Sequence, residues 1–305
     1  INIHFTSVQK LHSDLVQTEK ENALSIEDFE NREIVLLGDE AHHYNANTKN
    51  QTELFQSWEQ LITSIHQVNI ENILLEFTAT LDYESKDIIK KYQDKVIYKY
   101  DLAQFRIDKY SKEINLIRSN YDEKERIIQA IILNQYRQEL ATKQNINLKP
   151  VILFKAKKTI KESEQNKLNF HNLIDNLTAN EIDEIRATST VIIVQKAFAF
   201  FDSIHLTSNE LVNRLKSNFK PENCLSTNDD KEIEANQIKL NTLEDGNNPI
   251  RAIFSVHKLN EGWDVLNLFD IVRLYEGQNS GGSNKTFGST TIAEAQLIGR
   301  GARYF

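Results

Sequence analysis

The chain has 305 residues, enough for two domains of ordinary size, and its 40% of hydrophobic residues excludes a disordered protein. A formal net charge of −8 argues against a simple basic nucleic-acid-binding module, although one local groove can still be positive. The sequence contains no long apolar run and no basic-then-apolar N-terminus, and its single cysteine, Cys224, cannot form an internal disulfide. We therefore expect no membrane span, a cytoplasmic location and a buried packing role for Cys224.

Residues 1–83 alternate between predicted strands and predicted helices. Strands are expected at Ile1–Phe5, Ile34–Gly38 and Ile73–Phe77, and helices at Gln9–Glu19 and Gln51–Gln67. The short, β-branched run at Ile34–Gly38 is expected to be buried. Strands that alternate with helices imply a mostly parallel sheet.

Residues 84–149 are charged and contain neither glycine nor proline, and one long helix is expected at Tyr121–Thr142. We place a helical linker or extension here. A second α/β unit is expected from Pro150 to the end. Its predicted strands are Val151–Phe154, Cys224–Ser226, Ala252–Val256 and Ile271–Leu274. Its predicted helices are Lys161–Leu177, Thr190–Ser203, Leu211–Phe219, Ile233–Leu243 and Ile292–Ile298, and the glycine- and serine-rich Gln278–Ser289 is expected to be a mobile loop.

Asp39-Glu40-Ala41-His42 directly follows a predicted strand. Ligands in open α/β sheets bind beyond the carboxyl ends of the strands, so this position suits phosphoryl transfer. Asp39 would hold Mg²⁺ through water, Glu40 would orient and deprotonate the water that attacks the γ-phosphate of ATP, and His42 would couple the site to the second domain. Taken alone, the tetrapeptide is also compatible with an acidic loop after a core strand.

Two weaker motifs also follow predicted strands. The hydroxyl groups of Thr78 and Thr80 would bridge the two halves of an ATPase, although three small residues after a strand commonly form only a turn. In Asn260-Glu261-Gly262-Trp263-Asp264, Gly262 would allow close backbone approach, and Asp264 would contact the ribose or the arginines described next. Those residues are equally compatible with a capped and packed turn.

Gln296-Leu297-Ile298-Gly299-Arg300-Gly301-Ala302-Arg303 is the most specific single motif. Arg300 and Arg303 are three residues apart and would share one face of a helix. Two forked guanidinium groups can grip γ-phosphate oxygens and the charge that develops in the transition state, and Gln296 would contact the nucleotide.

Glycine and methionine are scarce. A phosphate-binding loop of the Walker A type needs glycines and a lysine, yet the first of nine glycines is Gly38 and no Gly-Lys pair occurs. We therefore expect these residues alone to bind ATP weakly or not at all. Methionine is absent, even at the start, which favours an internal fragment of a longer chain or a sequence from which methionines are missing.

Taken together and in this order, Asp39–His42, Thr78–Thr80, Gly262–Asp264 and Gln296–Arg303 resemble motifs II, III, V and VI of superfamily 2 helicases. The longer strings Leu259–Asp270, Ala295–Phe305, Phe77–Asp82 and Lys149–Lys155 resemble the restriction (Res) subunit of type III restriction-modification enzymes.

This resemblance implies two RecA-like (P-loop NTPase) domains with mostly parallel sheets: a first domain at residues 1–83, truncated at its N-terminus, and a second at 150–305, with the helical extension 84–149 between them. ATP and Mg²⁺ would lie between the domains and double-stranded DNA across their top. The family implies an ATP-driven DNA translocase that works with a methyltransferase (Mod) subunit and a separate nuclease domain, whose motif cannot be assembled from these residues. Another superfamily 2 helicase, from a phage or mobile element, and a non-catalytic DNA-binding remnant remain as alternatives.

Overall fold

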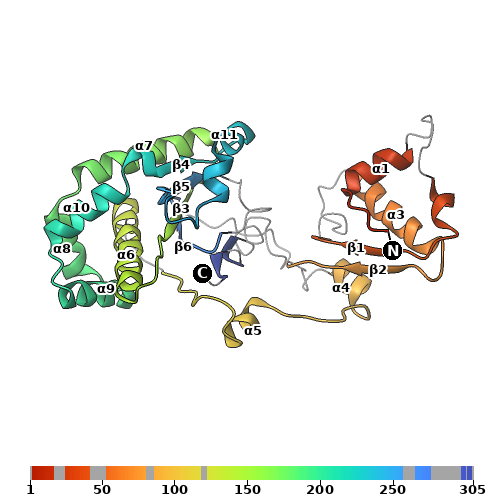
Figure 1. The fold of residues 1–305 in the computed structure, drawn as a ribbon, viewed down its shortest axis with the longest axis horizontal. Coiled ribbons are helices and arrows are strands. Elements are labelled where there is room, and N and C mark those ends of the chain that lie inside the picture. Colours follow the sequence, from red (N-terminus) through yellow and green to blue (C-terminus); the bar gives the residue numbers. More distant parts are fainter. Residues whose placement is uncertain are drawn as a thin grey trace. The chain divides into compact units, whose positions relative to one another are not determined.

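The structure is a computed structural model that describes residues 2–16, 25–41, 53–79, 86–117, 122–256, 265–275, 297–299 and 301–303. The chain divides into two compact units, the first reaching to Lys99 and the second beginning at Tyr100 (Figure 1). Each unit combines helices with a parallel sheet, which confirms the predicted α/β class. The division at residues 83 and 149 stays a prediction.

The first unit contains a two-stranded parallel sheet, in which β1 pairs with β2 from Val35 opposite Ile73 to Gly38 opposite Glu76. The elements in chain order are α1 (Val8–Val16), the 3-10 turn η1 (Ile26–Phe29), β1 (Val35–Gly38), α3 (Glu53–Gln67), β2 (Ile73–Glu76) and α4 (Lys86–Tyr92). The buried side chain of Asn72 accepts a hydrogen bond from the Ile34 amide at 2.8 Å and donates one to the Ile65 carbonyl at 2.9 Å. This amide therefore ties α3 to the start of β1.

Two expectations for the first unit were wrong. Residues 2–5 form no strand, and Ile3 and Phe5 are 77% and 92% exposed. Among the described residues β1 and β2 hydrogen-bond only to each other, so the alternating N-terminal segment has no strand partner to pair with. The strand β1 is also not buried on both faces. Val35 and Leu37 are 58% and 67% exposed, since α1 and α3 lie together on one side of the sheet and alternate side chains point to the other side (Figure 1).

The second unit is built on a four-stranded parallel sheet in the order β4-β5-β3-β6. Its strands are β3 (Val151–Lys155), β4 (Cys224–Ser226), β5 (Ala252–Ser255) and β6 (Leu268–Arg273). Its helices are α5 (Leu102–Ile107), α6 (Glu123–Lys143), α7 (Ile160–Asn176), α8 (Ala179–Thr188), α9 (Ile192–Ser203), α10 (Ser208–Asn218), the 3-10 turn η2 (Pro221–Asn223) and α11 (Asp230–Asn241). The predicted strands and long helices are confirmed within a few residues at each end, and α8 is an element that the sequence analysis did not predict.

Both faces of this sheet are covered, and the central strand β3 is buried at every position. Ile152 and Phe154 point into a core shared with α6, α7, α8, α9 and α10, whereas Val151 and Leu153 point into a second core shared with the end of α11. This alternation is the period of two that a strand with two buried faces requires.

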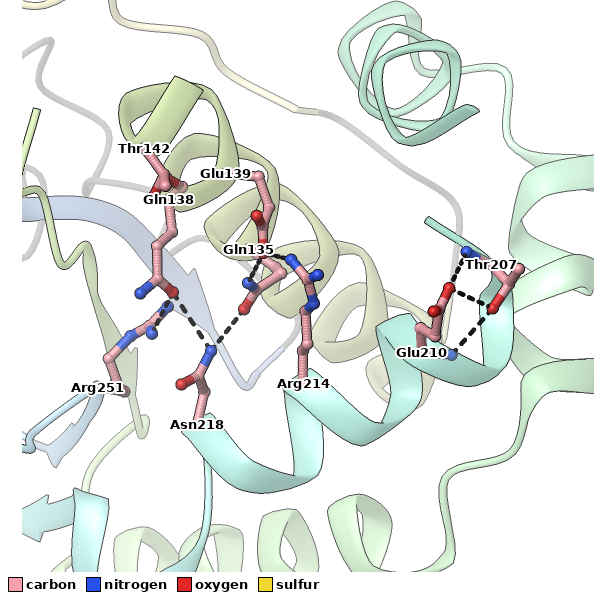
Figure 2. Close-up of polar contacts among 9 residues, drawn as sticks. All are labelled: Gln135, Gln138, Glu139, Thr142, Thr207, Glu210, Arg214, Asn218 and Arg251. Carbon is pink, nitrogen blue, oxygen red and sulfur yellow. Dashed lines mark hydrogen bonds and ion pairs between the residues drawn. The ribbon is translucent and has the colours of Figure 1, made fainter. Parts of the chain in front are cut away.

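Polar side chains connect α6 to α10 and to the start of β5 (Figure 2). We call this group the polar seam; it consists of Gln135, Gln138, Glu139, Arg214, Asn218 and Arg251. The Asn218 side chain donates to Gln135 at 2.7 Å, and Arg214 forms an ion pair with Glu139. On the sheet side of the seam lies Arg251, which is only 2% exposed. The seam orients α6 across the sheet through directional contacts, which apolar packing alone would not specify.

The hydrogen-bond donors of the buried Arg251 side chain find neutral acceptors and, in the described part of the chain, contact no carboxylate. Its guanidinium donates to the Asn134 side chain at 2.6 Å, to the Gln138 side chain at 2.6 Å and to the Pro150 carbonyl at 3.0 Å, and it lies 5.2 Å from the centroid of the Phe219 ring. Burial lowers the pKa of Arg251 to about 10, so the group stays charged at neutral pH.

Replacing Arg251 by Ala is expected to cost about 3 kcal/mol of unfolding free energy, because buried acceptors lose their donor and a cavity opens. The measurement is urea denaturation of the wild type and the variant. As a control, Arg186→Ala removes a half-exposed ion pair with Asp202 and is expected to cost less than about 1 kcal/mol. Equal losses in the two variants would contradict the role given to Arg251.

Candidate functional site

The carboxyl ends of β1 and β2 are joined by two backbone hydrogen bonds. The Phe77 amide donates to the Gly38 carbonyl at 2.8 Å, and the Ala41 amide donates to the Phe77 carbonyl at 2.9 Å. Ala41 is buried against Trp58 of α3. The chain therefore turns sharply after β1, and residues 39–40 and Thr78 leave the sheet at the same edge.

Asp39 and Glu40 occupy this turn. Asp39 is exposed, and its Oδ1 accepts a hydrogen bond from the Glu40 amide at 2.9 Å. Glu40 is half-buried and has a φ of 48°, the left-handed region that residues with a Cβ adopt at a cost of about 1 kcal/mol. Such strain persists where the surroundings fix the backbone, and it is concentrated at functional sites.

The chemistry of this edge fits a hydrated magnesium ion. Mg²⁺ keeps several waters and is bound through one or two carboxylates together with substrate phosphates, and Asp39 supplies an exposed carboxylate at the strand end. Within the described ranges there is no cluster of three or more His, Cys, Asp or Glu side chains that would hold a metal by protein ligands alone.

The arginine motif is anchored to the second unit. Leu297 is 1% exposed and belongs to the same core as Val151 and Leu153, and Ala302 is also buried. Gly301 packs so closely on Leu268 that a Cβ at this glycine would lie 3.4 Å from the leucine side chain. Residues 297–299 are helical, and Gly301 packs against β6.

Arg303 lies beyond that helical turn, which is a difference from the predicted shared helical face. It forms an antiparallel bridge with Ser111, and the neighbouring Ala302 carbonyl accepts a hydrogen bond from the Lys112 amide at 2.7 Å. The pairing with the 111–112 segment draws the chain out of the helix. The sequence analysis did not predict this segment as part of the site, because its contacts cross about 190 positions of the chain and leave no local pattern.

Only some predicted site residues are placed by the structure. Asp39, Glu40 and Thr78 come together at one sheet edge of the first unit, and Arg303 belongs to the second unit. Six other predicted residues lie outside the described part of the chain: His42, Thr80, Gly262, Asp264, Gln296 and Arg300. The predicted loop at Gln278–Ser289 and most of the predicted helix at Ile292–Ile298 also lie outside it.

Two comparisons show which known proteins the chain is similar to. Residues 1–83 match the family described as type III restriction enzyme, res subunit. The chain is 39% identical, over 333 aligned positions and 95% of its length, to a probable type III restriction-modification enzyme HindVIP Res subunit from Haemophilus influenzae. It spans 64% of the length of that relative. No helix in the described ranges combines the length and apolarity needed to cross a membrane. The motifs, the parallel α/β units and these two matches make the chain similar to type III restriction enzyme Res subunits.

Proposed function

We propose that this chain is part of an ATP-dependent DNA translocase or helicase motor of a type III restriction endonuclease. The motor would couple ATP hydrolysis to movement or switching on double-stranded DNA before a separate nuclease domain cleaves. The observation that carries the proposal is the placement of Asp39, Glu40 and Thr78 at one carboxyl edge of a parallel sheet, where α/β proteins bind their ligands.

The proposed chemistry begins with Asp39 and Glu40. Asp39 would hold, through a water, the magnesium ion that accompanies ATP, which would supply positive charge against the phosphates. Glu40 accepts the proton of the attacking water and orients its oxygen toward the γ-phosphate. Glu40 also has a positive φ of 48°, a conformation that is often found at functional sites.

In this proposal, the second unit contributes the remaining residues of the nucleotide site. Arg300 and Arg303 stabilise the charge that develops on the γ-phosphate oxygens, and Gly262, Asp264 and Gln296 contact the nucleotide. His42, Thr78 and Thr80 couple the two units when they close. The similarity to Res subunits supports double-stranded DNA and a Mod subunit as partners, and a cytoplasmic location.

The test is phosphate release by the complete protein that contains this chain, assembled with its Mod subunit. We expect Mg²⁺-dependent hydrolysis of ATP that rises when double-stranded DNA is added and stops when EDTA removes the metal. Hydrolysis that is absent with every DNA tried would reject the proposal. DNA cleavage that requires ATP would separate a restriction enzyme from another superfamily 2 helicase.

A non-catalytic DNA-binding remnant is the competing proposal. None of the nine glycines is followed by lysine, so residues 1–305 supply no Walker A loop from within themselves. Calorimetric titration of residues 1–305 with a non-hydrolysable ATP analogue is expected to detect weak binding at most. Tight, Mg²⁺-dependent binding would reject both the remnant proposal and the requirement for that loop.

A further inference from the structure

The start of the second unit runs beside the arginine motif. Ser111 is buried and forms an antiparallel bridge with Arg303, and the amide of Lys112 donates to the Ala302 carbonyl. Both contacts lie within the second unit, which begins at Tyr100. The segment that enters this unit from the first therefore touches the arginine motif before it reaches α6.

The side chain of Lys112 adds a second attachment at the same place. Its ammonium group donates to the backbone carbonyls of Leu266, Leu268 and Gly301, with the latter two at 3.0 and 2.9 Å. An ammonium group has three donors, so these three acceptors can use all of them. The Nζ atom also lies 4.1 Å from the centroid of the Phe269 ring, whose face attracts a cation.

The three carbonyls come from the two parts of the second unit that carry predicted nucleotide contacts. Leu266 and Leu268 follow Asp264 by two and four residues, and Gly301 directly follows Arg300. The Lys112 side chain thus bonds both stretches. The lysine therefore fixes the spacing between the chain that leaves Asp264 and the chain that carries the arginines.

The surroundings of the Lys112 ammonium group disfavour its positive charge. Burial, with a further contribution from Arg137 of α6, lowers the pKa of Lys112 to about 8, although Glu244 after α11 and Asp270 of β6 act in the opposite direction. Asp270 already has a partner, because Arg137 donates to both of its oxygens at 2.7 and 2.8 Å. An apolar side chain of similar length would fill the same space without this desolvation.

We propose that Lys112 is a positioning residue for ATP hydrolysis, which holds the arginine motif in register with the stretch after Asp264. The inference rests on the proposed function. Through the main chain of residues 111–112, the N-terminal segment of the second unit also contacts the arginine motif. Lys112 itself touches neither the nucleotide nor the attacking water.

The test compares Lys112→Met with Lys109→Met in the complete protein. Met keeps an apolar side chain of similar length and removes both the donors and the ammonium nitrogen that lies over the Phe269 ring. Lys109 is an exposed lysine three residues away. We expect Lys112→Met to lower kcat for DNA-dependent ATP hydrolysis about 10- to 100-fold, because small displacements of catalytic groups have effects of that size, and to leave KM for ATP within about twofold. Lys109→Met should leave both unchanged. An unchanged kcat in a folded Lys112→Met variant would overturn the inference.

Two further measurements separate positioning from simple loss of structure. Lys112→Arg keeps the charge, but its planar fork cannot direct three donors to the same carbonyls, so kcat should recover only in part. Full recovery of kcat in Lys112→Arg would contradict a positioning role. So would a loss of kcat in Lys112→Met that is explained by unfolding, seen as a thermal midpoint that falls below the assay temperature.

Limited trypsin digestion tests the geometry without relying on ATP hydrolysis. Loss of the Lys112 contacts should speed cleavage after Arg300 and Arg303 several-fold in Lys112→Met and not in Lys109→Met. If the wild type hydrolyses no ATP but digestion shows this change, the proposed function fails while the anchoring contact stands. If hydrolysis is normal and digestion is unchanged, the inference about Lys112 fails by itself.

Discussion

Replacing Glu40 by Gln in the complete protein is expected to lower kcat for DNA-dependent ATP hydrolysis by about 10³-fold, within the range that general-base catalysis contributes. Glutamine keeps the size and hydrogen-bonding shape of the side chain but cannot accept the proton of the attacking water. Mg²⁺-ATP should still bind, because Asp39 and the phosphate contacts are unchanged. Phosphate release and equilibrium binding of a labelled nucleotide, measured on the same preparation, check the two halves of this expectation.

Glu33→Gln is the matched control for this variant. Glu33 is an exposed glutamate at the opposite end of the same strand, two residues before Val35. The Glu33→Gln variant should hydrolyse ATP at the wild-type rate. Normal turnover in Glu40→Gln would remove Glu40 from the catalytic role, whatever the behaviour of the control.

Replacing Arg300 by Ala should have an effect of similar or greater size. Arginines that contact the transferred phosphoryl group contribute about 10³- to 10⁵-fold to kcat, and we expect a loss within that range with a much smaller change in KM. Arg300→Lys should recover little, because a single ammonium cannot reproduce a forked contact with two phosphate oxygens. Single-turnover hydrolysis at saturating ATP measures the effect on the chemical step.

Arg106→Ala serves as the control for the arginine variant. Arg106 is an exposed residue of α5 in a long ion pair of 3.7 Å with Glu113 and has no place in the proposed site. Its removal should leave hydrolysis unchanged. If Arg300→Ala raised KM and left kcat intact, Arg300 would be a nucleotide-binding residue with no role in the transition state.

The elements that the sequence predicted well are those whose burial pattern is local. Val151–Phe154 and Ala252–Phe254 are continuous apolar runs, and they lie in the two strands that form the buried centre of the second sheet. The common edge of Asp39 and Thr78 was also predictable, because parallel strands end on the same side.

The misses have identifiable physical causes. Residues 2–5 are not in a strand. Alternation of apolar and polar residues favours a strand, but a strand also needs a neighbouring strand to hydrogen-bond with. Helix α8 escaped prediction although Thr178 and Glu181 form a capping box at its start, a sequence pattern that could have found it. Lys112 had no such pattern, because its partners lie 154 to 189 positions away.

The proposed function requires that the two units close on one nucleotide. A distance measured between two spin labels, one in each unit, tests this requirement most directly. Labels at Glu33→Cys in the first unit and Asn213→Cys in the second would report the separation, since both positions are exposed. Cys224 should stay unlabelled, because it is buried and burial raises its pKa to about 12.

The measurement is made by pulsed electron paramagnetic resonance in a background that carries Glu40→Gln, so that bound ATP persists. We predict a shorter and narrower distance distribution when Mg²⁺-ATP and double-stranded DNA are both present, and a return to the nucleotide-free distribution when Arg300→Ala is added. A distribution that stays the same while ATP is shown to be bound would contradict a site shared between Asp39-Glu40 and the arginine motif.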